Sequence, residues 1–385
     1  MSVQHPGDDK MKFLFASDSF KGSLTSSRIT ELLTMAANEV FPCCECVGIP
    51  VADGGEGTVT AVINAVHGSI VSAAVHDPLM NIISAQYGVF EDKAIIEMAA
   101  ASGLPLVPEK LRNPLNTSTF GTGELIRHAL DRGCRNITIA IGGSATNDGG
   151  MGCMRALGVR FFDDNGAELS SIGSDLIRVS RIDTSGIDKR ISECRFTVMC
   201  DVTNPLCGEN GATYTFARQK GADDRVLEIL ERGMQNYRDV IKRQFGVNCD
   251  AVCGAGAAGG LGAALYVFCN GKMRSGIDTV LDLIGFDERL NGVDMIITGE
   301  GRADYQSVCG KVMQGVGLRA KAHDIPVTAL CGSIGEGADA LYGCGIKSLL
   351  TIMEDGMTVE YAIANAEKLY YDAAVRMFGE MRKSV

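Results

Sequence analysis

The chain has 385 residues, 46% of them apolar, which is enough for two or three packed domains. Its formal charge of −11 argues against nucleic acid and anionic membranes as partners, and the absence of Trp argues against a base-stacking platform. No apolar run approaches the roughly 18 residues of a membrane-spanning helix, and the polar start carries no signal core, so we expect a cytoplasmic protein.

Five short apolar runs predict strands that are buried on both faces, because none of them alternates cleanly between apolar and polar residues. In chain order they are Phe13–Ala16, Ile49–Val51, Ile137–Ile141, Phe196–Met199 and Met295–Thr298.

Helical patterns lie between these runs. The first has its apolar face over 29–40 and a cap at Thr25 or Ser26. A later pattern places Val308, Val312 and Val316 on one face, and a last long helix is expected to begin near Thr358. That last helix should turn four residues inward, namely Ile363, Ala366, Leu369 and Ala373. Strands that alternate with helices predict an α/β fold with a largely parallel sheet.

Each predicted strand runs into a polar, glycine-rich loop. The five loops are 18–23, 52–58, 142–150, 201–205 and 299–304. Ligands of open α/β sheets bind beyond the carboxyl ends of the strands. Five such ends that combine acids, hydroxyls, amides and glycine therefore predict a functional cleft.

The residue types in these loops indicate phosphate and metal. Glycine lets backbone N–H groups approach a phosphate closely, and Lys21 is a compact cation suited to a phosphate oxygen. Six acids would repel a polyphosphate unless Mg²⁺ stood between them. They are Asp53, Glu56, Asp148, Asp201, Glu300 and Asp304. This combination predicts magnesium-dependent phosphoryl transfer.

Several known motifs are missing or ambiguous. The sequence has no P-loop, no protein-kinase signature and no G-x-S-x-G elbow. The segment Gly254–Gly259 fits G-x-G-x-x-G, which leaves open a dinucleotide site, close helix packing or a nucleotide contact. The loop before Gly121–Glu124 suggests either an anion site at a helix start or simple capping. The 14 cysteines lack framework or zinc spacing and are expected to be reduced thiols.

At these loops the sequence resembles the type 1 glycerate kinases, from residue 12 to the C-terminus. The matching stretches occur in the family's order, and their combination is far more specific than any one of them. They are DSFKGSLT (18–25), PVADGGEGT (50–58), EMAAASGL (97–104), TSTFGTGELI (117–126), IGGSATNDGGMG (141–152), CDVTNPLCGENGAT (200–213), GAGAAGGLG (254–262) and TGEGRADYQS (298–307). The departures are modest: an N-terminal extension, the Cys43–Cys46 cluster, and the residues Ala303, Tyr305 and Ser307.

The resemblance implies two α/β domains with the active site in the cleft between them. One is flavodoxin-like, with a parallel sheet built from both chain ends, and we place it at 1–72 and 288–385. The second is inserted at 73–287. The resemblance also implies an enzyme that uses ATP and Mg²⁺ to phosphorylate D-glycerate, with 2-phosphoglycerate as the expected product.

The roles that we assign follow the matching loops. Asp201 is expected to act as the general base and Lys21 to assist catalysis. Substrate binding is assigned to Asp18, Ser19, Lys21, Gly54, Gly55, Ser144 and Asn147. Binding of ATP is assigned to Asn204, Gly254, Gly256, Thr122 and Gly123. Metal binding is assigned to Asp53, Glu56, Glu300 and Asp304.

Two other functions stay open at this point. One is a non-catalytic sensor of a hydroxy acid or phosphorylated metabolite, which would have no need of carboxylates facing a polyphosphate. The other is an NAD-dependent hydroxy-acid dehydrogenase, which rests on Gly254–Gly259 alone. The sequence decides neither the hydroxyl that is phosphorylated nor whether the protein is a monomer or a homodimer.

Overall fold

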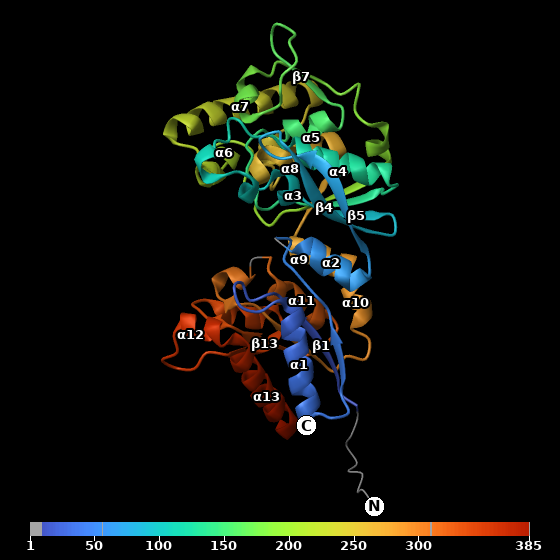
Figure 1. The fold of residues 1–385 in the computed structure, drawn as a ribbon, viewed down its shortest axis with the longest axis vertical. Helices are drawn as coiled ribbons and strands as arrows, with labels where there is room; N and C mark the ends of the chain where they lie inside the picture. The colour runs from blue at the N-terminus through green and yellow to red at the C-terminus, as the bar shows by residue number, and fades with distance from the viewer. Residues whose placement is uncertain (1–9, 56, 309, 385) are drawn as a thin grey trace, which may run out of the picture. The chain divides into compact units, whose positions relative to one another are not determined.

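The structure is a computed structural model that describes residues 10–55, 57–308 and 310–384. The chain divides into two compact units, Met1–Asp53 with Ile277–Val385 and Gly54–Gly276. Each unit contains a sheet with parallel strands and its own helices (Figure 1). The predicted α/β class is therefore confirmed.

The first unit is built on a five-stranded parallel sheet in the order β15-β13-β11-β1-β2. Its strands are β1 (Lys12–Ser17), β2 (Glu45–Gly48), β11 (Met295–Gly299), β13 (Val327–Cys331) and β15 (Ile346–Thr351). Numbered along this unit, the order is 2-1-3-4-5, which is the flavodoxin-like order. The predicted flavodoxin-like sheet from both chain ends is confirmed, and its topological switch point lies between β1 and β11.

Helices α1 and α13 lie side by side and pack on this sheet (Figure 1). Phe378 of α13 meets the ring of Phe13 edge-on at 5.1 Å between centroids. Thr25 caps α1 as predicted, since its side chain accepts a hydrogen bond from the N–H of Arg28 at 3.2 Å. The helices of this unit are α1 (Ser26–Val40), α9 (Gly276–Leu283), α10 (Phe286–Arg289), α11 (Val312–Ala322), α12 (Val359–Ala364) and α13 (Ala366–Ser384); a short two-stranded pair, β12 (Arg302–Ala303) and β14 (Ser333–Ile334), completes it.

Three details of the predicted elements are wrong in this unit. The strand expected at Ile49–Val51 is β2, which ends at Gly48, because an edge strand pairs on one side only and needs no fully apolar run. Val308 precedes α11 in a 3-10 turn. The last long helix is interrupted at Asn365, and Ile363 is exposed rather than turned inward.

The second unit is built on a six-stranded mixed sheet in the order β10-β9-β6-β5-β4-β3, with β3 and β4 antiparallel at one edge. Its strands are β3 (Ser69–His76), β4 (Ile82–Phe90), β5 (Lys93–Glu97), β6 (Asn136–Ala140), β9 (Arg195–Met199) and β10 (Lys272–Arg274). A separate hairpin pairs β7 (Arg160–Phe162) with β8 (Arg181–Asp183). The predicted strands at Ile137–Ile141 and Phe196–Met199 are confirmed as β6 and β9.

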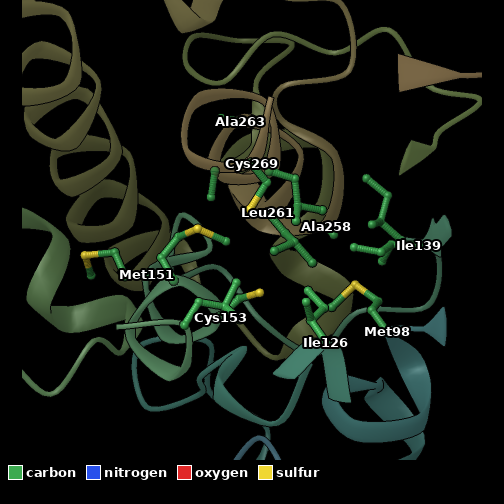
Figure 2. Packing of buried hydrophobic residues seen from close by; sticks show 14 of the residues in the cluster. Met98, Ile126, Ile139, Met151, Cys153, Ala258, Leu261, Ala263 and Cys269 are labelled. Carbon is green, nitrogen blue, oxygen red and sulfur yellow. The ribbon is translucent and has the colours of Figure 1, made fainter. Parts of the chain in front are cut away.

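Small and sulfur-containing side chains dominate one part of the second unit's core. Figure 2 shows Met151 and Cys153 of α5 close to Leu261 and Cys269 of α8. The helices are α2 (Thr58–Val66), α3 (Ala99–Ser102), α4 (Phe120–Asp131), α5 (Met151–Ala156), α6 (Ala212–Phe216), α7 (Asp224–Phe245) and α8 (Leu261–Cys269). None of the helices in the described parts of the chain is both long and apolar enough to cross a membrane.

The compact units change at 53/54 and 276/277, whereas the sequence analysis placed the changes at 72/73 and 287/288. Helix α2 accounts for the first difference, because it packs on the strands of the second unit. The Val59 N–H at its start donates to the Glu97 carboxylate at 2.8 Å. A Cβ on Gly88 of β4 would lie 2.5 Å from Cγ1 of Ile63. A regular β/α alternation in the sequence does not reveal which sheet such a helix covers.

Candidate active site

A cleft of about 370 Å³ lies at the carboxyl ends of β1, β11, β13 and β15 in the first unit. We call it the strand-end cleft. Its polar lining comes from the loops that follow these strands and from the end of this unit's first segment: Asp18, Ser19, Lys21, Ser23, Asp53, Glu300, Arg302, Lys311 and Ser333. The structure thus brings five of the predicted site residues together, Asp18, Ser19, Lys21, Asp53 and Glu300, beside the topological switch point where ligands of such sheets bind.

A tight turn presents Lys21 to the strand-end cleft. The N–H of Phe20 donates to the carbonyl of Leu24 at 2.8 Å, and the N–H of Leu24 donates back at 3.0 Å. Gly22 takes a left-handed φ of +79° at the tip of this turn, a conformation that favours glycine. The side chains of Phe20 and Leu24 are buried, while Lys21 between them is exposed. The apolar pair therefore holds the turn and leaves the cation free to meet an anion.

Asp18 carries the clearest electrostatic perturbation in the cleft. Burial raises the pKa of its carboxyl to about 6, and the negative charges of Asp53 and Glu300 add to the effect. A hydrogen bond from the Ser19 N–H at 2.7 Å and the charge of Lys21 oppose it. Two further carboxylates that act on Asp18 in this way make the acidic part of the cleft favourable for a cation.

Glu300 is held by two partners that the sequence analysis did not single out as a pair. The Ser307 hydroxyl donates to one carboxylate oxygen, and Nζ of Lys311 lies 3.3 Å from the other. Burial raises the pKa of Glu300 even so. Lys311 and Arg302 both line the cleft and were missed. Lys311 could have been noticed from its position directly before α11. The N-terminus of a helix carries a partial positive charge, so a lysine is unusual there.

The four residues predicted to bind Mg²⁺ have different surroundings. Asp53 and Glu300 line the strand-end cleft. Asp304 instead forms an ion pair with Arg302 at 3.1 Å and accepts the N–H of Gln306, and Glu56 lies outside the described residues. Within residues 10–55, 57–308 and 310–384, no group of three or more acidic, His or Cys side chains is placed to hold a metal ion. Two clustered carboxylates do fit Mg²⁺ that arrives with phosphates, because that ion keeps several waters and few protein ligands.

A second pocket, of about 320 Å³, lies at the carboxyl ends of β5 and β6 in the second unit. We call it the glycine pocket. It is lined by Gly54, Gly55, Glu97, Ala99, Ala100, Pro105, Ala140, Gly142 and Gly143. Gly143 has a φ of +73°, and its carbonyl accepts the N–H of Leu104 at 2.9 Å, which ties this part of the loop to the segment after α3. Glu97 was quoted in a motif but given no role, although it ends a buried strand as the other acids do.

The polar residues that follow this loop point inward. Asp148 is fully buried, and its carboxylate accepts hydrogen bonds from the Thr119 N–H, the Thr119 hydroxyl, and the N–H groups of Gly150 and Gly152. Burial raises its pKa, and these four bonds oppose the rise. Asn147 is also fully buried, with its amide nitrogen 3.3 Å from the Thr213 hydroxyl. Ser144 is buried as well, so this stretch presents backbone rather than side chains.

Asp201 is the exposed acid of the second unit's strand ends. It follows β9 by two residues, and one of its carboxylate oxygens accepts the N–H of Gly276 at 2.9 Å. This bond fixes the carboxylate without burying it. The predicted base therefore has a defined position and remains open to solvent.

Four of the five residues predicted to bind ATP are packed in the interior of the second unit. Thr122 shares a hydrogen bond of 2.7 Å with Ser102, and a Cβ on Gly123 would lie 2.3 Å from the carbonyl oxygen of Cys153. A Cβ on Gly256 would lie 2.2 Å from the carbonyl oxygen of Pro205, and Gly254 is equally buried. Close packing accounts for these four, and we do not carry them into the proposed site.

The fifth residue, Asn204, stabilises its own loop, because its side-chain amide donates a hydrogen bond to the carbonyl of Asn210 at 2.7 Å. The segment Gly254–Gly259 follows a 3-10 turn at Cys249–Ala251 rather than a strand. A dinucleotide-binding fingerprint requires a strand at that place. The packing interpretation of this motif is the one that the structure supports.

A flavodoxin-like unit, a second α/β unit, and acids and lysines gathered at strand ends together define an enzyme of the phosphotransferase class. The model of the glycerate kinase family matches residues 13–382, and this chain belongs to that family. The glycerate kinase of Bacillus cereus is 45% identical over 93% of this chain and 94% of its own length. The glycerate 2-kinase of Escherichia coli is 44% identical over 92% of this chain and 94% of its own.

A solved structure agrees with these relatives. A protein of Salmonella typhimurium LT2, assigned as a glycerate kinase 2, superposes with a TM-score of 0.89 at 42% identity, covering 98% of this chain and 99% of that one. The resemblance inferred from the loop motifs is therefore confirmed, and so is the conclusion that the protein is an enzyme.

Proposed function

We propose that this chain transfers the γ-phosphate of ATP to D-glycerate and releases 2-phosphoglycerate. The observation that carries the proposal is the strand-end cleft, where Asp18, Asp53 and Glu300 lie together with exposed Lys21 and with Lys311. The name of the Escherichia coli relative, glycerate 2-kinase, supports the 2-hydroxyl as the acceptor. We place the reaction in the cytoplasm, because every cysteine in the described residues is a free thiol.

The first unit would bind the donor's phosphates. Lys21 and Lys311 offer ammonium groups, and Gly301 and Gly332 let the phosphate chain approach the strand ends. Mg²⁺ bound with the triphosphate would neutralise charge as it develops on the transferred group. Asp53 and Glu300 are the residues that would hold it. Lys311 would then keep Glu300 ionised through the ion pair already present at 3.3 Å.

Each unit offers its own candidate groups for the acceptor. In the first unit, Lys21 and Ser19 are the groups that we assign to a carboxylate. In the second unit, the backbone N–H groups of Gly54, Gly142 and Gly143, which line the glycine pocket, are assigned to oxygens of the acceptor. Ser144 and Asn147 are too buried to touch it directly and would instead shape the loop.

Asp201 would accept the proton of the attacking hydroxyl. Its carboxylate is exposed and is oriented by the Gly276 N–H, which are the properties that a base needs before substrate arrives. We predict that Asp201→Asn lowers kcat by about 10² or more, the usual scale for loss of a general base. The KM for ATP should stay nearly unchanged. Asp164→Asn, an exposed acid in the hairpin region of the same unit, is the matched control and should leave kcat unchanged.

The product decides the proposal. Wild-type protein, D-glycerate, ATP and Mg²⁺ are incubated, and phosphorus NMR with proton coupling follows the new phosphate ester. A phosphate coupled to one proton is the 2-ester, and one coupled to two protons is the 3-ester. Release of ADP with no ester of glycerate would overturn the proposed acceptor, and a 3-ester would overturn the assigned hydroxyl. Turnover that Asp201→Asn leaves intact would remove Asp201 from its role.

A further inference from the structure

The strand-end cleft has a second half that the proposed chemistry leaves unused. Beyond the acids and lysines, its lining becomes apolar, and it is formed by Phe20, Ile352, Met353, Val359, Ala362, Ile363 and Ala366. These residues come from the turn after β1, the loop after β15, and the helices α12 and α13. Reaction of a three-carbon hydroxy acid with a triphosphate needs no such surface.

The apolar half has a buried floor and an exposed wall. Phe20 and Ile352 form the floor and are each 3% exposed. Val359 and Ile363 stand on one face of α12 and are 55% and 46% exposed. Ala362 and Ala366 follow the same helical spacing, and their small side chains leave the space between wall and floor open. Ligand pockets are lined mostly by apolar side chains, and exposed apolar side chains that gather at a cavity are typical of such a site.

The start of α12 is fixed, so this wall is a built feature. The Thr358 hydroxyl caps the helix by accepting the N–H of Tyr361 at 3.2 Å. The Asn365 side chain donates to the carbonyl of Tyr361 at 2.9 Å at the other end. The break at Asn365 separates α12 from α13. The helix is thereby held with Val359 and Ile363 towards the cleft.

The two halves together match a ligand with an anionic end and a flat apolar end. Glycerate cannot fill the apolar half, because every one of its three carbons carries a polar group. A nucleoside triphosphate has both ends: its phosphates suit Lys21, Lys311 and the acids with their metal ion, and its base suits an apolar slot. Met353 can adapt its shape to a ring, and its sulfur favours contact with an aromatic edge.

We infer that the apolar half of the strand-end cleft is the subsite for the purine base of the phosphate donor. The inference rests on the proposed function, since a kinase needs such a donor. The binding site that we propose for the donor is therefore in the first unit and not at the Gly254 loop, whose glycines are packed against backbone. One cleft of about 370 Å³ then holds base and phosphates in a line across the ends of β15, β13, β11 and β1.

A tryptophan reporter tests the subsite without relying on activity. The chain has no Trp, so Ile363→Trp would place the only indole of the protein at the wall of the cleft. Tyr361→Trp is the matched control, because Tyr361 lies on the same helix, is 55% exposed and does not line the cleft. We expect ADP and adenosine to change the emission of the Ile363→Trp protein in a saturable way, and tripolyphosphate to leave it unchanged. Tyr361→Trp should not respond to any of the three.

Steady-state kinetics of the full-length enzyme give a second test of the base subsite. A charge on the wall should disfavour the base, so Ile363→Glu should raise the KM for ATP about tenfold or more and change the KM for D-glycerate by less than about twofold. Tyr361→Glu should alter neither constant. An Ile363→Glu enzyme with an unchanged KM for ATP would overturn the base subsite while leaving the kinase assignment intact. If the wild type phosphorylates no glycerate, the proposed function fails. The Ile363→Trp protein then tests the subsite by itself: a saturable change of its emission with ADP supports the base subsite, and an unchanged emission overturns it.

Discussion

The two units use the same kind of loop in opposite ways. After β1 and β11 of the first unit, the loop side chains reach a cleft: Lys21 is exposed, and Asp18 and Glu300 line the cavity. After β6 of the second unit, the loop side chains turn inward: Asp148 is fully buried and Gly142 with Gly143 faces the pocket instead. One unit therefore presents charge, and the other presents backbone.

Hydrogen bonding explains the difference. Asp148 meets four donors within its own unit, so its carboxylate is satisfied without a ligand. Asp18 accepts the Ser19 N–H, and burial, with a smaller contribution from the charges of Asp53 and Glu300, raises its pKa to about 6. A carboxyl group with too few donors and too many like charges favours a cation from outside. The loop of Asp148 needs none and serves as a scaffold.

The largest predicted effect tests the scaffold. Asp148→Ala should lower the free energy of unfolding by about 4 kcal/mol, because it leaves buried donors unpaired and removes charge-assisted bonds. Urea unfolding followed by circular dichroism measures it. Asp163→Ala is the matched control: that carboxylate also accepts two loop N–H groups and pairs with Arg178 at 2.8 Å, but it is only partly buried, and its loss should cost about 1–2 kcal/mol. Equal losses in the two variants would contradict the scaffold role.

The next effect distinguishes packing from ligand binding at the glycine motif. Gly256→Ala should destabilise the protein by about 2 kcal/mol, since the added Cβ would lie 2.2 Å from the Pro205 carbonyl oxygen and force a shift. The KM for ATP of the folded enzyme should not change. Denaturant unfolding and steady-state kinetics are measured on the same preparation. A raised KM for ATP at unchanged stability would return this motif to the donor site.

Much of the fold could be predicted from the sequence. Four of the five predicted strands and the cap at Thr25 follow from periodicity and capping, which act over a few residues. The flavodoxin-like sheet was instead implied by the family resemblance, and the structure confirms it. The position of β2 and the break at Asn365 could not be predicted in this way, because the pairing of an edge strand and the end of a helix also depend on contacts with distant segments.

The candidate site was predictable in part. Asp18, Lys21 and Glu300 could be found because each ends a strand whose buried run is plain in the sequence. The burial of the Asn147 side chain could not be predicted, because the loop 142–150 has the same composition as a loop that binds a ligand. Lys311 was missed because it reaches the cleft from a helix start rather than from a strand end.

The smallest predicted effect concerns the charge buried beneath the scaffold loop. Lys220 is almost fully buried, and its Nζ donates to the Thr146 carbonyl at 2.7 Å. Burial lowers its pKa to about 7, while the charge of Asp148 opposes the shift. In the unfolded chain the same amine titrates at 10.5. Between these two values the unfolded state binds more protons, so the free energy of unfolding should rise with pH from about 7 towards 10.5.

Lys220→Met removes this rise and keeps most of the side chain's bulk. Urea unfolding at pH 7, 8 and 9 should show the wild type gaining about 1–2 kcal/mol relative to the variant over these two pH units. This gain is less than the full linkage value of about 2.7 kcal/mol, because Lys220 in the folded state is only part-way through its titration at pH 7. Other groups whose protonation differs between the folded and unfolded states in this range, cysteine thiols among them, are common to both proteins and cancel in the difference. Lys189→Met, at an exposed lysine, should run parallel to the wild type. Parallel curves for Lys220→Met would instead mean that Lys220 stays charged against Asp148. A buried ion pair between Lys220 and Asp148 would then hold the scaffold loop of the second unit. Both units would use charged side chains at their strand ends, and the difference between a unit that presents charge and one that presents backbone would be smaller.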